Sequence, residues 1–194
     1  MARVPYLTRD DAKTPEEEAV WQRLETERPL PTGYIFRALA QVPSVLDASL
    51  DYGASLRNDT EVDGKLRELA ILTVAIAANV EYAIAHHSGP AVLHGVTEEQ
   101  LAEMRNFESS DAFDAAERAV MRLAHESTVN VQISDEVWND ARSHLSEKEM
   151  VELVLNIGYY NNGVRLMAML DVDLEEPYVA DPVGAFLRDI GQAS

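Results

Sequence analysis

The feature that most constrains the fold is the stretch "KLRELAILTVAIAAN", residues 65–79, which is apolar on almost every side of a helix. Such a helix lies in the middle of a protein rather than on its surface. It is followed by "NVEYAIAHHSGPAVLHG", residues 79–95, which Gly95 closes. Two consecutive helices joined by a short turn predict an antiparallel hairpin at the centre of the fold.

Helix start and stop signals recur along the rest of the chain. Pro43 suits a helix start and Gly53 a stop, which predicts two short helices or one bent pair there. The last long helix is "EKEMVELVLNIGYYNNGVRLMAML", and "VNVQIS" is the only strand candidate. The sequence therefore predicts an all-α bundle of about eight helices. Four further N-caps are expected at Thr14, Thr97, Ser134 and Ser146.

The length of 194 residues suits one domain, with extensions at both ends. We expect an N-terminal helical arm over residues 1–33, the main domain over residues 34–170, and a tail over residues 171–194 that packs on a neighbour. Two long helices with wide apolar surfaces in a chain of this size favour a homo-oligomer.

Composition excludes several classes of function. A net charge of −18 repels phosphate backbones and anionic lipids, so we expect neither nucleic acid nor a membrane as partner. The N-terminus lacks the apolar segment of a secretory signal, from which a cytoplasmic location is expected. The chain has no cysteine, which excludes disulfides, thiolate zinc sites and a thiol nucleophile.

Three of the five histidines lie within residues 79–95. On a helix, His87 and His94 share one side, while Tyr82 and His86 form a neighbouring stripe. Because adjacent helical residues point about 100° apart, one of His86 and His87 should point inward and the other outward.

The predicted hairpin brings Glu68, in the first helix, near His87 in the second. A carboxylate beside an imidazole in a water-poor pocket can act as a general acid and base, because the carboxylate fixes the tautomer of the ring. The alternative is structural: Glu68 pairs with Arg67 or Lys65, and His87 is a partly buried histidine with its hydrogen bonds satisfied.

The segment "LRELAILTVAIAANVEYAIAHHSGPAVLHGVTEEQL", together with "ERAVMRLAHE" and "MVELVLNIGYYNNGVRLMAML", resembles the carboxymuconolactone decarboxylase and AhpD-like superfamily. In its redox members a Glu, a CxxC pair and a His form a proton relay for peroxide or disulfide chemistry. The resemblance implies that Glu68 and His87 are the relay residues here. The two cysteine positions hold Val80 and Ala83, so the chain resembles a branch without thiol peroxidase activity.

Without the redox chemistry, the resemblance implies the decarboxylase activity of the superfamily, in which a carboxylated lactone loses carbon dioxide. Such a reaction needs no metal or cofactor, because the unsaturated lactone carbonyl accepts the electrons. We assign proton transfer to His87, positioning to Glu68, and hydrogen-bond donation to Tyr82 or His86. Glu81 belongs to the same branch motif and is expected to contact the same pocket.

An anionic substrate requires a counter-charge within this acidic chain. Arg165 is the one cation in "YYNNGVRLMAML", the apolar second half of the last helix, and it is predicted to bind a carboxylate with Tyr160 and Asn156 as neighbours. The alternative is that Arg165 pairs with an acid at a subunit interface and that the two neighbours satisfy backbone groups.

Several other readings remain open. A metal site at His87 and His94 is disfavoured, because ligands on one helix normally lie three or four residues apart. The same Glu68 and His87 would also serve a hydrolase or an isomerase. A third reading is a binding or scaffold protein without catalysis. The resemblance implies a trimer or hexamer, with a dimer as the other option, and a small molecule as substrate.

Overall fold

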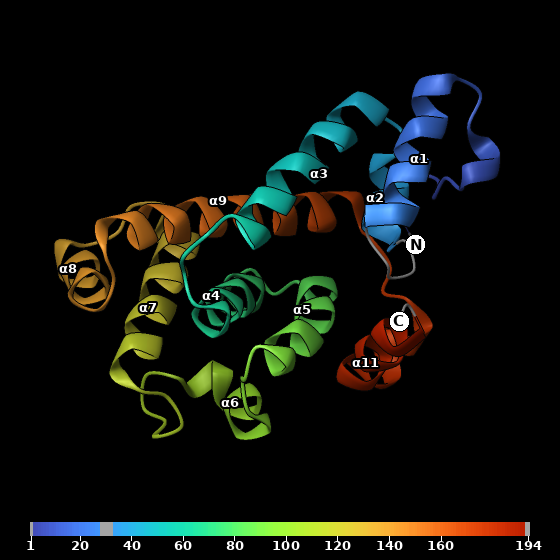
Figure 1. The fold of residues 1–194 in the computed structure, drawn as a ribbon. Coiled ribbons are helices and arrows are strands. Elements are labelled where there is room, and N and C mark those ends of the chain that lie inside the picture. Colours follow the sequence, from blue (N-terminus) through green and yellow to red (C-terminus); the bar gives the residue numbers. More distant parts are fainter. Residues whose placement is uncertain (1, 28–32, 193–194) are drawn as a thin grey trace.

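The computed structural model describes residues 2–27 and 33–192, which form eleven α-helices and no strand (Figure 1). The predicted all-α class is confirmed, and "VNVQIS" covers the end of one helix and the turn after it. Two short 3₁₀ helices span Arg9–Asp11 and Met104–Asn106. The α-helices are α1 (Pro15–Glu27), α2 (Tyr34–Leu39), α3 (Pro43–Asn58), α4 (Gly64–Ala77), α5 (Glu81–Leu93), α6 (Glu98–Glu103), α7 (Ala115–Asn130), α8 (Asp135–His144), α9 (Glu147–Leu170), α10 (Glu176–Ala180) and α11 (Pro182–Gln192).

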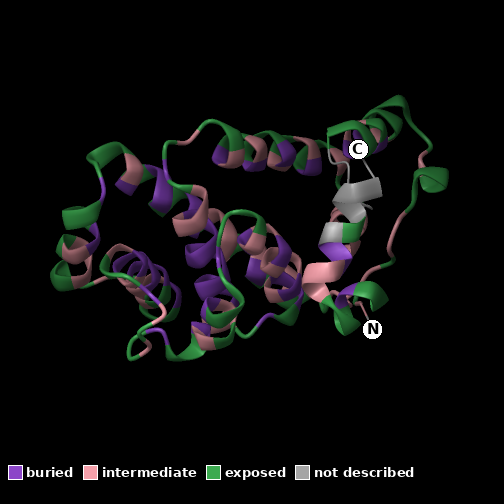
Figure 2. Cartoon of the chain, turned by 60° about the horizontal axis from the view of Figure 1, so that its bottom comes forward, coloured by how far each residue is buried: buried purple, intermediate pink, exposed green. Residues whose placement is uncertain are grey.

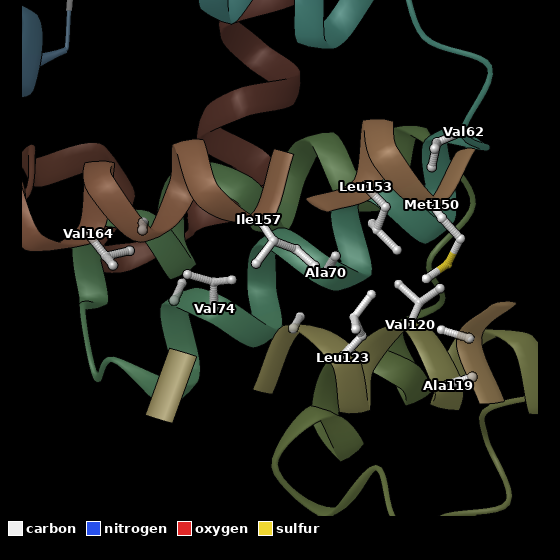
Figure 3. Close-up of a cluster of buried hydrophobic side chains, with 14 of the residues drawn as sticks. Val62, Ala70, Val74, Ala119, Val120, Leu123, Met150, Leu153, Ile157 and Val164 are labelled. Carbon is white, nitrogen blue, oxygen red and sulfur yellow. The ribbon is translucent and has the colours of Figure 1, made fainter. Parts of the chain in front are cut away.

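Helix α4 is the centre of the fold, as its sequence predicts. It lies beneath the long helix α9, with α7 on one side and α5 on the other (Figure 1). Every residue from 67 to 75 is buried. Figure 3 shows the apolar side chains of α4, α7 and α9 converging in the largest core cluster, among them Ala70, Leu123 and Leu153. Burial of this apolar surface holds the three helices together.

The turn between α4 and α5 makes the predicted hairpin. Asn79 adopts the left-handed region at φ 55°, which asparagine tolerates better than most residues. The N–H of Val80 then donates to the carbonyl of Ala75 at 3.0 Å. Helix α5 ends before Gly95, which has φ 93°. The chain thus reverses within three residues and sets α5 alongside α4.

The predicted N-caps form. The hydroxyls of Thr97, Ser134 and Ser146 each accept a hydrogen bond from the backbone N–H three residues later. At Thr97 and Ser146 the capping box is complete, because the side chains of Gln100 and Glu149 accept from the backbone N–H of the cap residue. Before α1, the hydroxyl of Thr14 accepts a hydrogen bond from the backbone N–H of Glu17 at 3.2 Å.

The predicted helix stop at Gly53 is wrong, because α3 continues through it to Asn58. The reason is tertiary packing. A Cβ at Gly53 would lie 2.7 Å from the hydroxyl oxygen of Tyr159 on α9. Glycine is present here for a close helix contact and not for a turn.

Both ends of the chain bury apolar side chains against other helices, and Figure 2 shows the buried residues in purple. In α1, Trp21 and Leu24 are buried in a cluster with Leu46 and Leu50 of α3. The tail, predicted to pack on a neighbour, places α10 and α11 against α5 of the same chain. Phe186 of α11 lies so close to Gly89 of α5 that a Cβ there would overlap its ring.

Among the described residues, none of the helices combines the length and the apolar character needed to cross a bilayer.

Candidate active site

Glu68 and His87 meet as the hairpin predicts. The Nδ1 atom of His87 lies 2.9 Å from the Oε2 atom of Glu68. The carboxylate is 4% exposed, and it lies on the buried central helix. A carboxylate at this distance accepts the proton on Nδ1, and Nε2 is the ring nitrogen that remains for a second partner.

The other nitrogen of His87 is not used by this contact. Its Nε2 atom has no hydrogen-bond partner in the described part of the chain, and the side chain is 19% exposed. The ring of Tyr160, from α9, stands edge-on to the imidazole with ring centres 4.8 Å apart. The imidazole is therefore fixed by α4 and α9 while one nitrogen stays available.

Asn156 lies one helical turn before Tyr160 on α9, on the same side of that helix. It is 2% exposed, and neither its amide nitrogen nor its amide oxygen has a partner among the described residues. Buried polar groups are almost always hydrogen-bonded, so an amide with both atoms free indicates a water or ligand position.

His86 points to a different carboxylate. Its Nε2 atom lies 2.7 Å from the Oε2 atom of Glu175, which immediately precedes α10. The ring is stacked between Tyr82 and Tyr178, with centroid distances of 4.3 Å and 4.1 Å. Both faces of this imidazole are therefore covered, and its Nε2 is already in use.

Glu175 also receives two further hydrogen bonds at its other oxygen. The Tyr82 hydroxyl donates at 3.0 Å and the backbone N–H of Tyr34 at 2.6 Å. Desolvation raises the pKa of Glu175, but the bonds from His86 and Tyr34 outweigh it, and the net pKa is lowered. Burial and the nearby carboxylate raise the pKa of Tyr82 well above its ordinary value.

The remaining predicted site residues lie elsewhere. Glu81 is exposed in the first turn of α5. Arg165 is exposed on another side of α9 from Tyr160, and donates to the carbonyl and side-chain oxygens of Asn161 at 2.8 Å and 2.6 Å. Arg165 lines a groove of about 480 Å³ between α7, α8 and α9, which neither Glu68 nor His87 lines. The structure thus separates Arg165 from the Glu68–His87 pair.

In the described residues, no three histidine or acidic side chains are grouped so as to hold a metal ion. His94, which the metal reading would require, faces Arg67 instead: its Nε2 lies 3.5 Å from a guanidinium nitrogen. Tyr178 and Glu175 were missed from the sequence. They lie in a segment without helical periodicity, and the only available signal was an acid and a tyrosine beside Pro177.

The geometry can be compared with known proteins. Residues 43–126 match the model of the Carboxymuconolactone decarboxylase family, and this range includes both Glu68 and His87. The predicted family resemblance is confirmed. The chain is also 25% identical over 109 residues to the uncharacterized protein YdfG of Bacillus subtilis (strain 168), covering 55% of this chain and 74% of that protein.

Solved structures share the fold across nearly the whole chain. The AhpD-core, peroxidase-related protein of Ralstonia eutropha JMP134 is 14% identical with a TM-score of 0.80, covering 94% of this chain and 96% of that one. The debrominase Bmp8, in a cysteine-to-alanine variant bound to 2,3,4-tribromopyrrole, is 18% identical with a TM-score of 0.78 and full coverage of both chains. The AhpD-like fold is confirmed.

Proposed function

We propose that this protein is a cofactor-independent lyase that removes carbon dioxide from a small unsaturated lactone or related carboxylic metabolite. The observation that carries the proposal is the 2.9 Å contact between His87 and the buried Glu68, with no partner for Nε2 of His87 among the described residues. The family match over the same residues supports this choice of reaction class.

The proposed reaction follows from what these groups can do. The bond between carbon and the substrate carboxylate breaks, and its electron pair moves into the unsaturated lactone to form an enolate. Protonated His87 gives the proton on Nε2 to carbon, and the ring regains a proton from solvent. Glu68 orients the ring and stabilises its charged form through Nδ1.

Asn156 is proposed to hold the oxygen on which negative charge develops. Its buried amide has no partner among the described residues, so an enolate oxygen would restore a hydrogen bond that folding leaves unmade. Bmp8 binds 2,3,4-tribromopyrrole in the same fold, which supports a small planar ring as the size and shape of substrate.

Thiol chemistry is not proposed, because the chain contains no cysteine to form a sulfenic acid or a disulfide. A debromination or peroxide reduction that needs a protein thiol therefore has no nucleophile here. Peroxide turnover by the purified, metal-free protein would contradict this part of the proposal.

The test is turnover of unsaturated γ-lactones that carry a carboxylate, followed by carbon dioxide release and by product NMR in D₂O. The wild-type protein should release one carbon dioxide per product and place one deuterium on carbon. Glu68→Gln should lower kcat about 10²-fold or more, since a displaced or uncharged partner weakens acid–base catalysis. His125→Gln, which changes an exposed histidine on α7, is the matched control and should leave kcat unchanged.

The products separate this proposal from its alternatives. Ring opening without carbon dioxide would indicate a hydrolase, and deuterium exchange without loss of mass would indicate an isomerase. Binding of the lactones without any turnover would favour a non-catalytic binding protein.

A further inference from the structure

Arg67 is a buried cation that has no acidic partner among the described residues. It lies on α4 beside Glu68 in sequence and is 8% exposed. One guanidinium nitrogen donates to the backbone carbonyl of Arg57 at 3.2 Å, and another lies 3.5 Å from Nε2 of His94. Its Nε has no partner, and no carboxylate of the described residues forms an ion pair with it.

This arrangement is costly for a charged group. Removing a guanidinium from water loses several kcal/mol of hydration, and a carbonyl and an imidazole do not neutralise its charge. Buried charges in folded proteins are normally paired. The chain has 34 acidic residues against 16 basic ones, yet no acidic side chain that the structure describes forms an ion pair with this cation. The missing counter-charge is therefore expected from outside the chain.

Arg67 lies beside an exposed side chain and the start of a helix. His94 is exposed, and its ring lies so close to Gly64 that a Cβ there would overlap it. Gly64 is the first residue of α4, a helix of 14 residues whose N-terminus carries a partial positive charge. Asp63, the residue before α4, already caps this helix by accepting from the N–H groups of Lys65 and Leu66.

We propose that Arg67 and His94, at the N-terminus of α4, bind a small oxyanion such as a phosphate or a carboxylate. The anion would enter past the exposed His94 and accept N–H bonds from the guanidinium, in place of the long contact with the imidazole. The position is distinct from the Glu68–His87 pair, because His94 lies seven residues, or about 10 Å along the helix axis, beyond His87. It does not depend on the proposed function.

The experiment is thermal unfolding of the full chain in sodium phosphate and in sodium succinate, each against sodium chloride at equal ionic strength. At about 100 times Kd, a specific anion should raise Tm by about 5–10 °C over chloride. Phosphate and succinate together distinguish a tetrahedral from a carboxylate ligand, since the better ligand shows the larger rise at equal concentration.

Arg67→Gln should abolish this rise. Arg57→Gln is the matched control, because only its backbone carbonyl contacts Arg67 while its guanidinium lies near Gly53. If Arg67→Gln does not fold, His94→Ala replaces it; this exposed substitution should lower the anion-dependent rise at least by half.

Equal Tm values in phosphate, succinate and chloride would overturn the proposal. A rise that survives in both Arg67→Gln and His94→Ala would overturn it as well. The remaining alternative is that a second copy of the chain supplies the counter-charge, and sedimentation velocity tests it. If wild type shows no anion response and Arg67→Gln changes the oligomeric state, this alternative holds and the anion site is rejected.

Discussion

Two adjacent histidines of α5 carry the same chemistry in two different settings. His87 contacts the buried Glu68 and keeps one ring nitrogen free of partners among the described residues. His86 contacts Glu175, and its ring is covered on both faces by Tyr82 and Tyr178. An imidazole–carboxylate pair is therefore not by itself a catalytic site. The difference lies in whether an atom and a face remain open to a reactant.

The largest expected effect is the difference in activity between substitutions at His87 and at His86. His87→Gln should lower kcat/KM for the lactone substrate by about 10²–10⁴, because it removes the proton donor. His86→Gln should change kcat/KM less than tenfold, because its role is to hold Glu175. Steady-state kinetics of the two variants measure this. A greater loss in His86→Gln would reverse the assignment of the two histidines.

The next largest effect concerns the contact between the tail and the central hairpin. Gly89→Ala places a methyl group against Phe186 and should lower the free energy of unfolding by about 1–3 kcal/mol. Gly163→Ala on α9 is the control, since a Cβ there meets nothing within 4 Å and should raise stability by about 0.5–1 kcal/mol. Urea unfolding measures both. In limited proteolysis, the first cleavages of Gly89→Ala should fall in the tail beyond residue 170. If Gly89→Ala resists the protease as well as wild type does, this role of α11 is contradicted.

A third prediction uses pH to isolate the Glu175 contact. Its pKa is lowered in the folded protein, so its contribution to stability is present above the unfolded value of about 4.5 and is lost as pH falls through the folded pKa. The free energy of unfolding of wild type should therefore be about 1.5 kcal/mol larger than that of Glu175→Gln at pH 7. Urea unfolding at pH 3 should show a much smaller difference. The same difference at both pH values would mean that the charge of Glu175 contributes nothing.

The smallest effect concerns the hydroxyl of Tyr82. Tyr82→Phe removes one donor to Glu175 and the acceptor for the N–H of Ile35, and should cost about 1 kcal/mol. Tyr52→Phe, at a ring that is 44% exposed, is the control and should change the free energy of unfolding by less than about 0.5 kcal/mol. Equal values for the two variants would show that the Tyr82 hydroxyl adds nothing to the cluster.

The sequence predicted the part of the site that local geometry determines. Glu68 and His87 lie on consecutive helices, so helix length and one short turn were enough to bring them together. The buried character of α4 and the caps at Thr97 and Ser146 follow from residue patterns of the same kind. The family match covers this same region.

The missed features depend on contacts between distant segments. Glu175 reaches His86 from 89 residues away, and no periodicity in residues 171–181 indicates where that segment lies. Gly53 was predicted as a helix stop because its close partner, Tyr159, is visible only after α3 and α9 pack. Arg165 was grouped with Tyr160 by its place on an apolar helix, but side chains five residues apart point in different directions.

The separation in sequence also sets the order in which the two pairs can form. Glu68 and His87 are 19 residues apart, whereas His86 and Glu175 are 89 apart. Because a chain is synthesised from its N-terminus and short loops close first, the Glu68–His87 hairpin can form before Glu175 has been added to the chain. A chain that stops short of residue 175 would carry the first pair without the second.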